Sequence, residues 1–368
     1  MKVLMIFIDM VKGVDLSKNK SKMQTRAFKN YLDKLGGTIF TNTFTEGPDT
    51  PRSMSSFYTG KKPSENGCID RLRWPEYFLN TEETIFDYFI DNNFKLDFFS
   101  NPNERANGLF PKKISQLKNV HNETINLNHF IDELTLSDDQ LLFISLPDLH
   151  FSMDDIGYNL LGEFYGYYNV IKSLNIIFNR FHKDIFDNIL IFSDHGFKYR
   201  SQLAFEKRSF SLNRDRTQVF LFSRNKFDNS INYSENLLAL SDVFHVFRFL
   251  KKDINIDLIQ NLISFKRDYI LIEDHSKFNN EYGQFIGKWA YVNSKHYYIR
   301  NQENAILIDL ESEKVIEGYN KFYENELLAL KSFREFHDVS IKLNQYNTNI
   351  LVPSIKYTSG IKRIKFPF

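Results

Sequence analysis

Short apolar runs alternate with amphipathic stretches over the first two thirds of the chain. The runs predict strands over 3–9, 37–44, 95–100, 141–148, 188–194 and 218–223. The amphipathic stretches between them predict helices over 24–35, 84–92 and 162–181. This alternation of strands and helices indicates an α/β fold, in which helices flank a mostly parallel central sheet.

The pattern changes near residue 265. Closely spaced strand-like runs over 266–274, 288–301 and 304–312 predict a small antiparallel sheet, and a helix is expected over 324–336. No repeat or low-complexity linker separates the two parts. We therefore expect an α/β domain over 1–265 and a C-terminal α+β subdomain over 266–368 that packs on it.

Composition restricts the kinds of partner. The chain has 368 residues, of which 42% are hydrophobic, enough for a large core. Its 47 Lys and Arg nearly balance its 46 Asp and Glu, so nothing draws it as a whole to nucleic acid or to an anionic membrane. The apolar N-terminal run ends at Asp9 and is too short for a signal segment or a membrane span. With Cys68 as the single cysteine, these features predict a cytoplasmic protein that has no internal disulfide.

Three predicted strands end on acidic and imidazole side chains. Asp9 follows the first, Asp148 and His150 follow the run over 141–148, and Asp194 and His195 follow FS in FSDHG. The carboxyl ends of parallel strands lie at one edge of a sheet, so these groups are expected to converge there. Clustered carboxylates repel one another unless a cation neutralises them. Mixed oxygen and nitrogen ligands suit one divalent ion such as zinc, manganese or calcium.

A helix start is expected at Thr50, because Thr is a favoured cap and Pro51 suits the first helical position. The free N–H groups and positive dipole of a helix beginning there would suit a phosphate or sulfate beside the Thr50 hydroxyl. The alternative is that Thr50 is only a cap. A metal ion at the neighbouring strand ends would activate this hydroxyl as a nucleophile.

Several motifs occur in an order that resembles one known family. Thr50 precedes Thr59 and Gly60 by nine and ten residues, and Pro63 and Gly67 follow. The other matching segments are the Tyr pair at 167–168, SDHG at 193–196, Lys207 nine residues before Arg216, SDVFHVFRFLKKD from Ser241, NSKHYYIRN from Asn293 and IDLESEKVIEGYN from Ile308. With these motifs the chain resembles the sulfatase-like branch of the alkaline phosphatase superfamily, nearly from end to end.

The resemblance implies a set of site residues. One divalent metal ion would be held by Asp9, Thr50, Asp194 and His195. Thr50 would be the nucleophile, His150 and Lys207 would contact the transferred group or the leaving oxygen, and Asp148 is a further candidate ligand. His275 and His296 lie where a second zinc site would fall, but no spacing selects either. The substrate implied is a small-molecule or glycan phosphate or sulfate ester.

The chain also departs from the family pattern. True sulfatases carry a Cys or Ser that is oxidised to formylglycine, and Thr50 cannot be converted in this way. Met54 stands where the sulfatase motif has Arg, and Met10 where it has a second Asp. These departures favour a Thr-dependent enzyme of phosphate esters, similar to the phosphodiesterases, phosphoethanolamine transferases and glycerol-phosphate transferases of the superfamily. Two alternatives stay open: sulfate ester hydrolysis by direct attack of metal-bound hydroxide, and an inactive relative that serves as a binding or scaffold protein.

Overall fold

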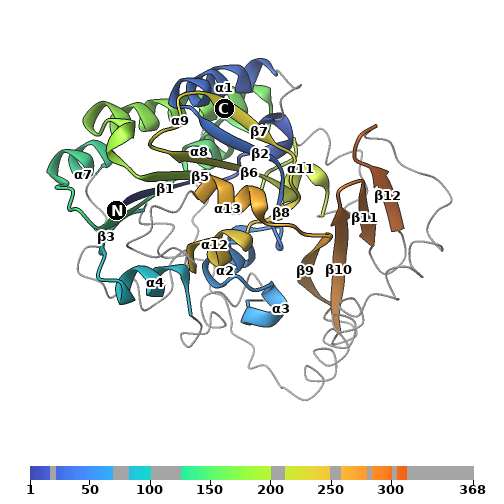
Figure 1. Ribbon diagram of the computed structural model, residues 1–368. Coiled ribbons are helices and arrows are strands. Elements are labelled where there is room, and N and C mark those ends of the chain that lie inside the picture. The colour runs from blue at the N-terminus through green and yellow to red at the C-terminus, as the bar shows by residue number, and fades with distance from the viewer. Residues whose placement is uncertain are drawn as a thin grey trace, which may run out of the picture.

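The residues that the structure describes form one large sheet and one small sheet, which lie beside each other (Figure 1). The computed structural model describes residues 1–16, 22–68, 83–100, 126–199, 212–248, 258–279, 284–300 and 305–312. The α/β architecture predicted from the alternating pattern is confirmed.

The large sheet has the strand order β3-β4-β1-β5-β6-β2-β7. The short strand β8 also pairs with β2, next to a different part of that strand than β7. Its strands are β1 (Lys2–Ile8), β2 (Gly37–Phe44), β3 (Lys95–Phe99), β4 (Gln140–Leu146), β5 (Asn188–Phe192), β6 (Gln218–Asn225), β7 (Ile231–Ser234) and β8 (Leu238–Ala239). Each of the six strand runs expected in this part of the sequence forms a strand.

Strand direction determines which segments reach the functional edge. β3, β4, β1 and β5 are parallel, whereas β6 is antiparallel to both of its neighbours, β5 and β2. β2 therefore runs in the same sense as β1 and β5. The carboxyl ends of these three strands lie at one edge of the sheet, and β6 begins at that edge.

Helices cover both faces of the sheet (Figure 1). In chain order they are η1, a 3-10 helix (Gly13–Leu16), α1 (Met23–Leu35), α2 (Thr50–Thr59), α3 (Pro63–Asn66), α4 (Ile85–Asp91), α7 (Leu127–Glu133), α8 (Asp148–Ile156), α9 (Leu160–Arg180), η3, also 3-10 (Lys183–Ile185), α11 (Arg214–Thr217), α12 (Asp242–Arg248) and α13 (Leu258–Ser264). The helices predicted over 24–35, 84–92 and 162–181 correspond to α1, α4 and α9 within two residues at each end.

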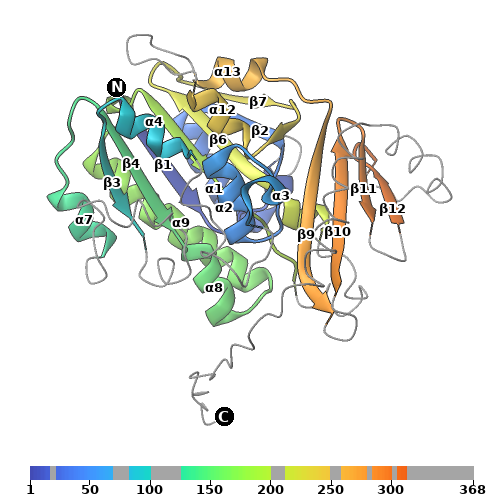
Figure 2. The same ribbon diagram turned by 90° about the horizontal axis from the view of Figure 1, so that it is seen from below.

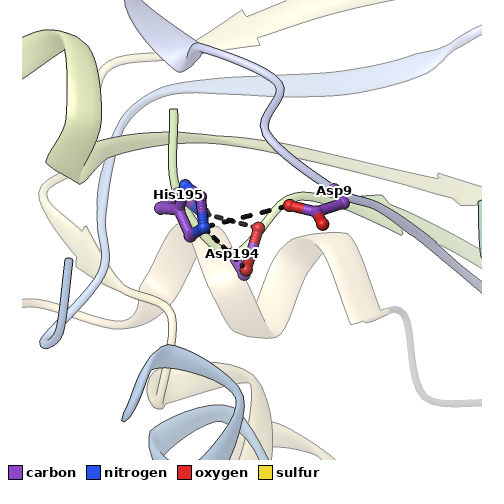
Figure 3. A group of neighbouring side chains, drawn as sticks. All are labelled: Asp9, Asp194 and His195. Carbon is purple, nitrogen blue, oxygen red and sulfur yellow. Dashed lines mark hydrogen bonds and ion pairs between the residues drawn. The ribbon is translucent and has the colours of Figure 1, made fainter. Parts of the chain in front are cut away.

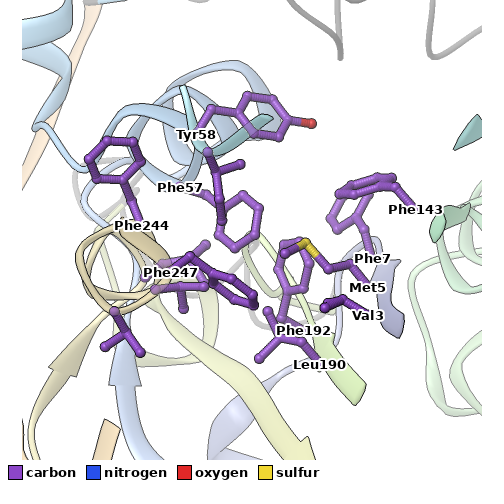
Figure 4. Close-up of a cluster of buried hydrophobic side chains, with 14 of the residues drawn as sticks. Val3, Met5, Phe7, Phe57, Tyr58, Phe143, Leu190, Phe192, Phe244 and Phe247 are labelled. Atoms are coloured by element: carbon purple, nitrogen blue, oxygen red, sulfur yellow. The ribbon is translucent and has the colours of Figure 1, made fainter. Parts of the chain in front are cut away.

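The two faces of β1 belong to two separate apolar cores, because successive side chains of a strand point to opposite faces. Val3, Met5 and Phe7 pack with α2, α4, α12 and α13, and part of this core is drawn in Figure 4. The alternate residues of β1 pack with α1, α7, α8 and α9 on the other face. Burial on both faces explains why the strand reads as a continuous apolar run.

The small sheet is antiparallel, as predicted. It has the order β12-β11-β10-β9 and consists of β9 (Tyr269–Asn279), β10 (Gln284–Asn293), β11 (His296–Arg300) and β12 (Ala305–Asp309). The helix predicted over 324–336 lies outside the described residues, and the domain boundary near residue 265 stays a prediction. Among the helices described, none combines the length and the apolar character needed to span a membrane.

Candidate metal centre and active site

Asp9, Asp194 and His195 meet at the edge where β1 and β5 end (Figure 3). β1 and β5 are adjacent and parallel, and Phe7 pairs with Phe192. Asp9 and Asp194 therefore occupy equivalent positions two residues further along. One ligand atom from each of the three side chains lies within 4.8 Å of the others. The structure thus brings together three of the four predicted metal ligands.

The donor atoms of this group suit a cation. The Oδ1 atom of Asp9 and the Oδ2 atom of Asp194 are buried, and neither accepts a hydrogen bond within the described part of the chain. They lie 3.9 and 3.5 Å from His195 Nε2. His195 Nδ1 lies 2.8 Å from the carbonyl oxygen of Gly196, which can only accept, so Nδ1 carries the proton and Nε2 keeps its lone pair. Two unsatisfied carboxylate oxygens and an imidazole nitrogen that keeps its lone pair are a donor set for one divalent ion.

Thr50, the fourth predicted ligand, joins this group from β2. The loop after β2 leads into α2, which begins at Thr50 with Pro51 in its first turn and Asp49 as its cap. The Thr50 Oγ1 atom lies 3.3 Å from His195 Nε2. A helix begins here as predicted, but its cap is Asp49, and Thr50 is the first helical residue instead of the cap. This start directs the threonine hydroxyl at the three candidate ligands.

The two carboxyl groups differ in their electrostatic surroundings. Burial raises the pKa of Asp194 to about 6. Burial also opposes ionisation of Asp9, but a hydrogen bond from His150 and the charges of His150 and His195 hold the pKa of Asp9 below its usual value. Asp9 is therefore ionised beside a carboxyl group that is protonated more easily, because burial and the negative charge of Asp9 both disfavour ionisation of Asp194.

His150 lies in the first turn of α8 and contacts Asp9. Its Nδ1 atom lies 2.6 Å from Asp9 Oδ2, and its Nε2 atom lies 3.4 Å from Asp154 Oδ2. Burial alone would lower the pKa of His150, but the hydrogen bond and charge of Asp9 outweigh it and raise the pKa to about 9. His150 is thus a cationic side chain, one third exposed, at the rim of the site.

Of the two further sequence candidates, Asp148 does not join the group and Lys207 lies outside the described residues. Asp148 begins α8, and its Oδ1 atom accepts a hydrogen bond from Ser173 of α9 at 3.1 Å. It is not part of the cluster of ligand atoms around His195. Arg216, which belongs to the same sequence motif as Lys207, lies just before β6 and donates from Nε to the carbonyl oxygen of Pro48 at 2.6 Å.

The other residues of the SDHG motif support the two ligands. Ser193 donates from Oγ to the carbonyl oxygen of Val11 at 2.6 Å and accepts a hydrogen bond from the backbone of Phe220 at 2.9 Å. Gly196 allows a close approach, since a Cβ atom there would lie 2.0 Å from the carbonyl oxygen of Asp215. These contacts hold the end of β5 between the segment after β1 and the start of β6.

A buried ionic network behind the site was not anticipated from the sequence. Lys12, which follows β1, contacts Asp15 Oδ2 and Glu163 Oε1, each at 3.0 Å, and lies over the ring of Phe197 at 4.2 Å. All three charged side chains are at most 4% exposed. Lys22 reaches the other oxygen of Asp15 at 2.5 Å. Lys12 thereby connects the segment after Asp9 to α9 and to the segment after His195.

Replacement of Lys12 by Met is expected to lower the free energy of unfolding by about 3 to 5 kcal/mol, because Glu163 would lose its buried cationic partner. Urea denaturation would measure this change. The matched control is Lys22→Met. The Lys22 side chain is 44% exposed, and its removal leaves Asp15 paired with Lys12. A loss below about 1 kcal/mol is expected for the control. Equal effects of the two substitutions would contradict a structural role for the buried network.

Comparison with solved structures identifies the fold. No protein-family model and no curated protein matches the sequence. A 2-O GAG sulfatase has 11% sequence identity and a TM-score of 0.65, with coverage of 94% of this chain and 93% of that chain. A protein solved with its substrate D-glucosamine-2-N,6-O-disulfate also has 11% identity and a TM-score of 0.65, covering 95% and 99% of the two chains. The phosphonate monoester hydrolase of Silicibacter pomeroyi has 11% identity and a TM-score of 0.61, covering 94% and 95%.

The chain therefore has the same fold as these sulfatase and phosphonate monoester hydrolase structures. The sulfatase-like fold expected from the sequence motifs is confirmed. At this level of identity the likeness concerns the fold, and the chemistry has to be argued from the site.

Proposed function

We propose that this protein is a metal-dependent hydrolase or phosphotransferase that acts on phosphate esters through Thr50. The observation that carries this proposal is the position of the Thr50 hydroxyl. It lies at the N-terminal end of α2, 3.3 Å from His195 Nε2 and beside two buried carboxylates. A hydroxyl placed at the positive end of a helix and next to a cation site suits attack on an anionic ester.

Asp9, Asp194 and His195 would hold one divalent ion, with Thr50 as a fourth ligand. When bound, that ion would supply Lewis-acid stabilisation of the ester oxygens and lower the pKa of the threonine hydroxyl. Burial raises the pKa of the Asp194 carboxyl to about 6, which makes it the more basic of the two carboxylates. The Asp194 carboxylate is the base proposed to take the Thr50 proton.

The proposed reaction has two stages. The Thr50 Oγ1 atom attacks phosphorus, the bond from phosphorus to the leaving oxygen breaks, and a phosphothreonine forms. Water or an acceptor hydroxyl then attacks the same phosphorus and gives its proton to the now neutral His150, while the bond from phosphorus to Thr50 breaks and Thr50 takes back its proton from Asp194. His150 is proposed to protonate the leaving oxygen from Nε2, because its raised pKa keeps it cationic at neutral pH. Lys207 is proposed to stabilise the negative charge on the non-bridging oxygens.

Sulfate ester hydrolysis is the second candidate function, and the structural neighbours favour it. One neighbour is a 2-O GAG sulfatase, and another was solved with a sulfated glucosamine as its substrate. These neighbours support a glycan ester as the substrate class. A phosphonate monoester hydrolase on the same fold supports the phosphorus chemistry. Thr50 favours the phosphate ester, since threonine cannot form the formylglycine that true sulfatases use.

A substrate panel tests the proposal. Matched aryl phosphate monoester, phosphodiester and sulfate ester would be assayed with added zinc, manganese or calcium. We expect metal-dependent cleavage of a phosphorus ester, with turnover of the sulfate ester at least about tenfold slower. Faster release of sulfate would select the second candidate. A protein that binds no cation and cleaves none of the three esters would correspond to the inactive relative.

A further inference from the structure

The first strand of the small sheet contacts the segment around Thr50. β9 carries two adjacent buried carboxylates, Glu273 and Asp274. Glu273 accepts hydrogen bonds from the backbone N and the Oγ of Ser64 at 2.9 and 2.8 Å, and its own backbone N donates to the carbonyl oxygen of Glu46 at 2.8 Å. Figure 2 shows β9 beside α3 and near α2. Adjacent residues of a strand point to opposite faces, so Asp274 extends away from Ser64.

Asp274 reaches α2 through Arg52. The NH1 group of Arg52 donates to Asp274 Oδ1 at 2.8 Å, and its Nε group lies 3.1 Å from both carboxylate oxygens of Asp49. Arg52 is 1% exposed, yet the two carboxylates outweigh the effect of burial and raise its pKa. Arg52 therefore stays charged, and its planar guanidinium bridges a carboxylate of β9 and a carboxylate of the α2 cap.

The bridge acts on the turn that presents the nucleophile. Asp49 caps α2 by accepting a hydrogen bond from the backbone N of Arg52 at 3.3 Å, and Thr50 is the next residue. Both carboxylate oxygens of Asp49 contact the guanidinium of Arg52, so the Asp49 side chain is fixed in the bridge. Movement of Arg52 would move the cap and the Thr50 backbone together.

We propose that Asp274 and Arg52 are positioning residues that hold the Thr50 hydroxyl opposite His195. The small sheet is then part of the catalytic apparatus, although it supplies no ligand among its described residues. This inference rests on the proposed function, since it assigns Thr50 as the group that has to be aligned. Displacement of a reacting group by 1 Å can lower a rate by about 100-fold.

The test compares Asp274→Ala with Asp274→Asn and Glu273→Gln. For Asp274→Ala we expect kcat to fall by about 10-fold to 100-fold, with KM changed by less than about threefold and metal content unchanged. Asp274→Asn keeps an oxygen that accepts a hydrogen bond from Arg52, so its kcat should lie within about fivefold of that of the original protein. Glu273→Gln alters the neighbouring carboxylate of β9 and its contact with α3, so it should keep kcat within about threefold.

A crystal structure of Asp274→Ala supplies a readout that does not depend on activity. We expect the distance from Thr50 Oγ1 to His195 Nε2 to increase by about 1 Å, which is the scale of displacement that affects rates. If the original protein cleaves no ester, the proposed function fails, and this distance alone decides the positioning role. If Asp274→Ala does not fold, Arg52→Lys replaces it, because a lysine cannot bridge both carboxylates in the same geometry. An unmoved Thr50 with unchanged kcat would overturn the proposal.

Discussion

Thr50→Ala is expected to lower turnover of the preferred ester by at least about two to three orders of magnitude, while the protein keeps its fold and its bound cation. The substitution removes the hydroxyl that lies 3.3 Å from His195 Nε2 but leaves the Asp49 cap in place. The loss should appear in kcat, because the bond from Thr50 to phosphorus forms only during the reaction. Steady-state assays of both proteins with the same metal would measure it.

The matched controls are Thr50→Ser and Ser53→Ala. A serine keeps a hydroxyl at the same point, so turnover within about tenfold of the original is expected. Ser53 is buried and donates from Oγ to the carbonyl oxygen of Asp194 at 2.7 Å, so its removal should affect stability more than chemistry. Full turnover by Thr50→Ala would exclude the covalent mechanism. Ser53 or a metal-activated water would then become the next candidate nucleophile.

Asp194→Asn is expected to lower affinity for the divalent ion by at least about 100-fold, a larger loss than the 10-fold to 100-fold typical of an outer-shell change. The Asp194 Oδ1 atom accepts hydrogen bonds from the backbone N of His195 at 2.7 Å and of Met10 at 3.4 Å. The oxygen of an asparagine can keep these bonds, but the charge opposite Asp9 is lost. Metal content by mass spectrometry and calorimetric titration would measure the change, and activity should fall with it.

The unfolding temperature provides a second, independent test of this prediction. A cation that binds only the folded state raises the unfolding temperature, and Asp194→Asn should abolish that increase. Without metal, the variant should be at least as stable as the original protein, since one of two neighbouring buried carboxylates has become neutral. Asp148→Asn is the control. Asp148 accepts a hydrogen bond from Ser173 and is not a candidate ligand in the structure, so this substitution should leave metal binding intact. Equal loss of metal in both variants would contradict the assignment of ligands.

The fold and the central residues of the site could be predicted from the sequence, because short segments of the chain carry the patterns that indicate them. β1 and β5 are buried on both faces, so each reads as an apolar run that ends abruptly on a polar group. The common edge of parallel strands then places Asp9 beside Asp194 and His195 without knowledge of any contact. The helix start near Thr50 was also visible from Pro51, although the cap is Asp49 and not Thr50 as predicted.

The contacts that support the site could not be predicted from the sequence, because they join residues that are far apart in the chain and share no local sequence pattern. Arg52 and Asp274 are 222 residues apart in the chain, and Lys12 and Glu163 are also distant. A buried Arg or Lys resembles a surface residue in sequence, and only the packed structure shows its partners. α8 was also missed, because the segment 148–156 was read for its acid and imidazole side chains and not for helical periodicity. Its helical turn is what brings His150 back onto Asp9.

The strand order has a consequence for synthesis of the protein. Thr50 and His195 are 145 residues apart, and β1 lies between β4 and β5 in the sheet. A growing chain can pair β1 with β4 first, but it has no Asp194 or His195 to offer until β5 has emerged and joined β1. A nascent chain that stops before β5 therefore lacks two of the three buried donors. The proposed metal site can accordingly form only after β5 has joined β1, and a bound cation would report that the central strands have assembled.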